Sequence, residues 1–63
     1  MTTLESFAPD DIHAGVTLME RTGGHFAHNI ARAWFYAGMG NQRRLWSAFN
    51  DLFVWFIEQA KEQ

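Results

Sequence analysis

Three histidines are the side chains in this sequence whose type and spacing come closest to a metal site. His25 and His28 are three residues apart, a spacing that places both rings on one face of a helix. A transition metal would need a third and preferably a fourth ligand, for which His13 or Glu20 could serve. No HExxH pattern or calcium-binding loop accompanies the pair, which is more typical of a solvated helix start. We therefore expect no metal and no cofactor, and a site at His25 and His28 stays open as an alternative.

Catalytic chemistry has less support in the residue types. The chain contains no cysteine, which excludes thiol catalysis, thiolate zinc sites and disulfides. Its serine and threonine hydroxyls belong to no nucleophile elbow. The glycines at 23–24 and at 38 and 40 are too sparse for a phosphate-binding loop. We expect a protein that is not an enzyme.

Arg43 and Arg44 form the only basic cluster and fall in the first turn of a predicted helix. Residues near the start of the second helix of a helix-turn-helix reach base edges, so the pair could belong to a small DNA-associated transcriptional regulator. The formal net charge of −2, and Asp51, Glu58 and Glu62 further along the same segment, oppose phosphate binding. Nucleic-acid binding is therefore the alternative hypothesis, and binding to another protein is the leading one.

An excess of aromatic side chains supplies the positive evidence for protein binding. They make up 16% of the 63 residues, whereas a domain of this size buries only about 60% of the surface that its unfolded chain exposes. Trp, Tyr and Arg are also the residues enriched at binding hot spots. The predicted partner-binding residues are Trp55, Trp46, Val54, Phe35, Tyr36, Arg43 and Arg44.

We expect residues 1–63 to form a single domain. Glycines divide it into three segments, which must position these side chains. The first, residues 9–22, begins with Pro9 and two aspartates, which favour the first turn of a helix, and ends before Gly23. Its apolar stripe consists of Ile12, Val16 and Met19. A short strand through residues 15–19 is the alternative, because Gly, Val and Thr are poor helix formers.

The second segment, residues 25–37, has a clearer helical period. The predicted core face consists of Phe26, Ile30, Ala33, Trp34 and Ala37. The short connector that follows predicts that the next helix runs antiparallel to it. Asn41 is the residue expected to cap that next helix.

The third segment, residues 42–61, has the strongest apolar stripe of the chain. Its predicted core positions are Leu45, Phe49, Leu52, Phe53, Phe56 and Ala60, with Trp46 and Ile57 at the edge. Val54 and Trp55 fall outside the stripe. The other two segments cannot easily cover all of this apolar surface within a monomer. We therefore expect part of it to contact a partner protein, and we also expect a homodimer. The predicted fold is all-α: a small three-helix domain dominated by an antiparallel helical hairpin.

Nothing in the sequence suggests export or membrane insertion. Residues 1–7 have neither the basic nor the apolar region of a signal peptide. The longest apolar run, residues 52–57, is far shorter than the roughly 20 residues that span a bilayer. We expect a soluble, cytoplasmic protein.

Residues 24–57 resemble a pattern found in short uncharacterised proteins of tailed bacteriophages and prophages. The resemblance is carried by His25-Phe26, Ile30-Ala31-Arg32-Ala33-Trp34, Asn41, Arg44-Leu45, Ala48-Phe49 and Leu52-Phe53. It implies a phage accessory protein that acts in the host bacterial cytoplasm, in a group that includes inhibitors of host defences such as anti-CRISPR proteins. The implied partner is a bacterial host protein, which the chain inhibits or modulates, and the resemblance implies no catalytic residues.

Overall fold

The computed structural model describes residues 2–63, and within them every regular element is a helix. A short 3-10 helix, η1, spans Leu4–Ser6 and is followed by α1 at Pro9–Thr22, α2 at Gly24–Tyr36, α3 at Met39–Ala48 and α4 at Asn50–Lys61. The predicted all-α class is confirmed. The predicted count of three helices is wrong, because the third segment forms two helices.

Helix α1 begins and ends where the sequence predicted. Pro9 occupies its first turn beside Asp10 and Asp11, and Gly23 follows its last residue, so no strand forms in this segment. Gly23 donates its backbone N–H to the carbonyl of Met19 at 3.0 Å, which satisfies one of the free carbonyls at the helix end. Gly24 then turns the chain into α2 with a φ of +79°, a conformation that favours glycine.

The prediction for the core face of α2 is confirmed for Trp34 and Ile30 and wrong for Phe26 and Ala33, because the buried face is rotated towards Ala27 and Ala31. The buried residues of α2 are Ala27, Ala31 and Trp34, whereas Phe26 is 63% exposed. The alanines face the core because their small side chains let α2 approach its neighbours closely. Phe26 instead contacts Phe49 at the surface, with ring centroids 5.6 Å apart.

The long helix predicted for residues 42–61 breaks at Phe49, whose φ of −125° and ψ of 35° are not helical. In a straight helix, positions 46 and 53 would lie about 10.5 Å apart along the axis. The break allows the rings of Trp46 and Phe53 to stack with their centroids 5.5 Å apart. The predicted cap at Asn41 is also wrong, because α3 begins three residues earlier than predicted, at Met39, and its N-cap is Gly38.

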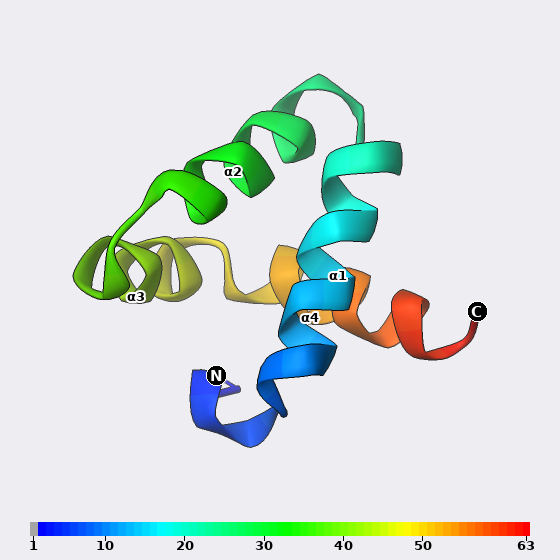
Figure 1. The fold of residues 1–63 in the computed structure, drawn as a ribbon, viewed down its shortest axis with the longest axis horizontal. Helices are drawn as coiled ribbons and strands as arrows, with labels where there is room; N and C mark the ends of the chain where they lie inside the picture. The colour runs from blue at the N-terminus through cyan, green and yellow to red at the C-terminus, as the bar shows by residue number, and fades with distance from the viewer. Residues whose placement is uncertain (1) are drawn as a thin grey trace.

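Helix α1 lies at the centre of the fold and makes the most extensive helix contacts, first with α4 and then with α2. Figure 1 shows α1 crossing α4 near the centre of the view, with α2 and α3 to the left of that crossing. Contacts between α2 and α3 are few, so the predicted hairpin of the second and third segments does not dominate the fold. The core formed by these contacts consists of Val16, Met19, Ala27, Ala31, Trp34, Trp46, Phe53, Phe56 and Ile57.

Gly15 makes the crossing of α1 and α4 close. A Cβ atom at this position would lie 2.5 Å from Cγ1 of Ile57 and 2.7 Å from its Cα. Gly15 and Ile57 are both buried. The glycine that weakens the helix propensity of α1 is therefore the residue that brings α4 against it.

Candidate interaction surface

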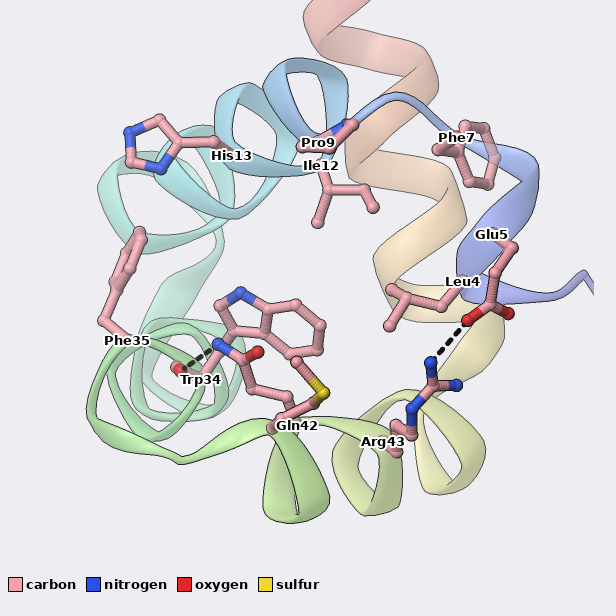
Figure 2. A pocket seen from close by; sticks show the side chains of 11 residues that line it. Leu4, Glu5, Phe7, Pro9, Ile12, His13, Trp34, Phe35, Gln42 and Arg43 are labelled. Atoms are coloured by element: carbon pink, nitrogen blue, oxygen red, sulfur yellow. Dashed lines mark hydrogen bonds and ion pairs between the residues drawn. The ribbon is translucent and has the colours of Figure 1, made fainter.

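The surface of residues 2–63 contains an open groove of about 660 Å³. It lies between the N-terminal segment, the first turns of α1, the end of α2 and the start of α3 (Figure 2). Apolar side chains from all four elements line it, and polar groups stand among them. The lining residues are Leu4, Glu5, Phe7, Pro9, Ile12, His13, Trp34, Phe35, Met39, Gln42 and Arg43.

Exposed apolar side chains gather where α2 ends and α3 begins. Tyr36 is 80% exposed, Met39 is 74% exposed and Phe35 is 39% exposed. Ala37 and Gly38, both extended, connect the two helices and leave these side chains without a covering element. We call this region the α2–α3 corner and define it as Phe35, Tyr36 and Met39 together with the arginines Arg32, Arg43 and Arg44.

A second, smaller hollow lies beside the same corner. Its volume is about 350 Å³, and Tyr36 and Arg44 stand in its lining with Ala33, Ala37, Asn41 and Leu45. The guanidinium of Arg32 lies over the Tyr36 ring, 5.7 Å from its centroid, at the distance of a cation–π contact. Exposed Met39 therefore lines the larger groove, and exposed Tyr36 lines the smaller hollow.

One ion pair closes the rim of the groove. Arg43 donates a hydrogen bond to the carboxylate of Glu5, and both side chains are more than half exposed. This hydrogen bond lowers the pKa of the Glu5 carboxyl below its ordinary value. On another wall of the groove, the rings of His13 and Phe35 meet edge to face with centroids 5.7 Å apart.

Charge is unevenly distributed along the chain. Residues 21–50 contain four arginines and no aspartate or glutamate, whereas residues 1–20 contain four acids and no lysine or arginine. Three of those four arginines belong to the α2–α3 corner. In the folded chain Arg43 faces Glu5 and Arg32 faces Glu20, so Arg44 is the corner arginine that has no ion pair within residues 2–63.

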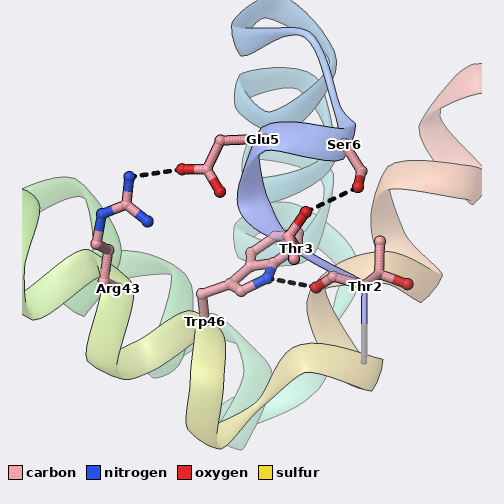
Figure 3. Close-up of polar contacts among 6 residues, drawn as sticks. All are labelled: Thr2, Thr3, Glu5, Ser6, Arg43 and Trp46. Atoms are coloured by element: carbon pink, nitrogen blue, oxygen red, sulfur yellow. Dashed lines mark hydrogen bonds and ion pairs between the residues drawn. The ribbon is translucent and has the colours of Figure 1, made fainter.

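The N-terminal segment is held against α3 and α4 by hydrogen bonds to the backbone of Thr2. The indole N–H of Trp46 donates to the carbonyl of Thr2 at 2.8 Å, as Figure 3 shows. The Asn50 side chain donates to the same carbonyl at 2.6 Å and accepts from the Thr2 N–H at 3.3 Å. These contacts place Leu4, Glu5 and Phe7 along one wall of the groove.

The structure separates the predicted partner-binding residues into three groups. The first group belongs to the α2–α3 corner and consists of Phe35, Tyr36, Arg43 and Arg44. Trp55 lies apart from it on α4, where it is 54% exposed and its ring packs against Phe56. Val54, next to Trp55, is half-buried and packs against the core.

Trp46 is only 4% exposed, so its predicted place on an outer flank is wrong. It is buried because the break at Phe49 turns its ring onto Phe53, and because the N-terminal segment covers it with the side chain of Phe7. Its indole N–H is occupied by Thr2. Trp46 therefore supports the groove from within and does not present a surface to a partner.

Sequence reasoning missed Met39, Leu4 and Glu5 as members of this surface. Met39 stands between two glycines in a stretch interpreted as a turn, and the N-terminal residues carried no periodic pattern. The sequence signal that could have drawn attention to the region is the acid-free run of residues 21–50.

The three histidines have different surroundings in the fold. Nδ1 of His28 lies 2.8 Å from the carbonyl oxygen of Glu20, and the Glu20 carboxylate faces Arg32 at 3.9 Å. His25 is exposed and His13 packs on Phe35. Within residues 2–63, no group of three or more His, Cys, Asp or Glu side chains could hold a metal ion.

Comparisons with known proteins place the chain in no family. No family model matches it, and neither a curated protein nor a solved structure matches it. None of the helices in residues 2–63 has the length and apolar character needed to cross a membrane.

Proposed function

We propose that this protein is a small interaction module that binds another protein through the α2–α3 corner and the adjoining groove. The observation that carries the proposal is the concentration of exposed Tyr36 and Met39 beside an apolar groove of about 660 Å³. Aromatic residues, Met and Arg are the types enriched at protein interfaces. A partner side chain that enters the groove would remove apolar surface from water, which is the main driving force of association.

The resemblance to short phage proteins suggests the setting of this activity. In that setting the partner is a bacterial host protein in the host cytoplasm, and binding inhibits or modulates it, as an anti-defence protein of the anti-CRISPR kind would. A module of this type needs no catalytic residue, because binding to a functional surface of the host protein is sufficient to block that protein. The proposal includes no enzyme activity and no cofactor.

The experiment is affinity capture from a bacterial lysate followed by mass spectrometry, using the full chain and matched surface variants. We expect Tyr36→Ser and Met39→Ser to lose the captured partner and to retain the melting temperature of the parent protein, because both side chains are mostly exposed. Trp55→Ser is the control, since it removes a half-exposed aromatic residue from a different helix. Loss of the partner in Trp55→Ser alone would show that α4 and not the corner binds it.

We assign Trp55 and the neighbouring Val54 to a second proposal, the homodimer contact. Trp55 presents more than half of its side chain to solvent on α4, and two such surfaces can meet about a twofold axis. Light scattering should report a dimer that Trp55→Ala converts to a monomer. A parent protein that stays monomeric at high concentration would refute this contact and would leave the proposal for the corner intact.

Binding of DNA through Arg43 and Arg44 is the competing function. The acid-free run of residues 21–50 favours it, but the formal net charge of −2 opposes phosphate binding. The exposed apolar side chains of Tyr36 and Met39 have no role in contacts with a phosphate backbone. A salt-dependent shift of duplex DNA that is abolished in the double variant Arg43→Ala and Arg44→Ala would establish this function in place of protein binding.

A further inference from the structure

We infer that the α2–α3 corner selects an acidic segment of its partner protein. The inference rests on the proposed function and adds the chemistry of the ligand. It starts from the juxtaposition of exposed Tyr36 and Met39 with three exposed arginines in a stretch, residues 21–50, that contains no Asp or Glu. Arg43 and Arg32 each face one carboxylate from residues 1–20. A surface of this composition is complementary to a ligand that carries both apolar side chains and carboxylates.

The three arginines surround the apolar side chains of the corner. Arg32 lies over the ring of Tyr36, and Arg44 lines the smaller hollow together with Tyr36. Arg43 lines the larger groove together with Met39. A segment that covers Tyr36 therefore lies beside Arg32 and Arg44, and one that covers Met39 enters the groove that Arg43 lines.

The chain itself already places a carboxylate on one of these arginines. Figure 2 shows Glu5 reaching across the rim of the groove to Arg43. The two side chains are 63% and 56% exposed, so a carboxylate of a partner can approach Arg43 from solvent. Arginine binds carboxylates through charge-assisted hydrogen bonds in a planar fork geometry. Arg44 offers the same group, and Arg32, which faces Glu20 at 3.9 Å, is still 49% exposed.

Exposed apolar side chains favour a protein ligand over a nucleic acid. Apolar side chains of a peptide can cover Tyr36 and Met39, whereas a phosphate backbone offers none. The formal net charge of −2 also opposes binding of a polyanion.

The experiment compares three synthetic peptides that share one helical frame, with Leu and Phe at i, i+3 and i+7 and with Glu, Gln or Lys at the remaining positions. A 20-base-pair duplex DNA is the fourth probe. Binding of each to the full chain is measured by fluorescence anisotropy. We expect the Glu peptide to bind about tenfold more tightly than the Lys peptide, because several exposed ion pairs add while each alone is weak. This preference should shrink as salt is raised.

Two charge-reversal variants make the test specific to the corner. Arg44→Glu should reduce or reverse the preference for the Glu peptide. Arg21→Glu makes the same change in charge at the end of α1, at the opposite end of α2 from the corner, and should leave the preference unchanged. An equal effect of the two variants would show that only net charge matters and would overturn the inference.

The remaining outcomes separate the inference from the function on which it rests. Equal binding of all three peptides, lost in Met39→Ser, would refute the acidic preference and support the groove as a protein-binding site. Binding of the DNA duplex at least as tightly as the Glu peptide would refute the inference in favour of nucleic acid. Failure of every probe to bind would also refute it, and capture from lysate would still decide the proposed function.

Discussion

Replacing Gly15 with alanine tests the closest contact of the fold, the crossing of α1 and α4. A Cβ atom at Gly15 would lie 2.7 Å from Cα of Ile57 and 2.9 Å from its backbone nitrogen. Carbon atoms in contact are normally about 3.5–4.0 Å apart. Because two of the overlapping atoms belong to the backbone of Ile57, a change of rotamer cannot relieve the overlap, and the two helices must separate by on the order of 1 Å.

The net effect on stability is a difference between two terms. Alanine improves the helix propensity of position 15 by about 1 kcal/mol relative to glycine. Overpacking of a core costs about 1–3 kcal/mol and occasionally more, and here the separation also loosens the contacts of the buried Val16, Met19 and Phe53. We expect Gly15→Ala to lower the free energy of unfolding by about 2 kcal/mol, a large share of the roughly 3–9 kcal/mol available to 63 residues.

The assay is urea and thermal unfolding followed by far-UV circular dichroism. A loss of about 2 kcal/mol should lower the melting temperature by about 8–16 °C in a domain of this size. Gly40→Ala is the matched control, because Gly40 lies within α3 and a Cβ atom there would have no neighbour within 4 Å. We expect this variant to be up to about 1 kcal/mol more stable than the parent protein. If Gly15→Ala is as stable as Gly40→Ala, the close crossing of α1 and α4 is refuted.

Three further predictions follow from single contacts. Trp46→Phe removes the indole N–H that holds the N-terminal segment and should lower the free energy of unfolding in urea by about 1–3 kcal/mol. The control Trp55→Phe should change this free energy by less than about 0.5 kcal/mol. Equal losses in the two variants would contradict the role of the N–H. Phe53→Ala should cost about 3–5 kcal/mol and remove most cooperative melting, because the ring is fully buried; a well-folded variant would contradict this core. The Glu5 carboxyl, followed by NMR, should titrate below the pKa of an ordinary glutamate and move towards it in Arg43→Gln. Because this pKa is lowered in the folded state, the stabilisation is present above the unfolded pKa and is lost as the pH falls through the folded pKa; an ordinary titration in the parent protein would contradict the ion pair.

Local signals in the sequence determined helix α1. Pro9, the two aspartates that follow it and Gly23 define its limits through the chemistry of helix ends, which acts within a few residues. The all-α class also follows from local periodicity. The sequence further identified Phe35 and Tyr36 as residues at the margin of the core, and both lie at the surface of the α2–α3 corner.

Helix rotation and the break at Phe49 were decided by tertiary packing. An apolar stripe shows that a helix buries one side, but two edges of the stripe are nearly equivalent until a neighbouring helix selects one. Ala27 and Ala31 face the core of this fold and Phe26 does not, because small side chains permit close packing. Asn50 and Asp51, residue types common at helix starts, were the local sign of the break, but the stacking of Trp46 on Phe53 accompanies it.

The groove could not be read from the sequence because its walls come from separate segments. Leu4 and Glu5 reach Met39 and Arg43 only after Trp46 and the Asn50 side chain bind the N-terminal segment. Residue types at these positions show which side chains can bind a partner. Their placement in one surface depends on contacts between residues about 40 positions apart, which periodicity and local propensity do not encode.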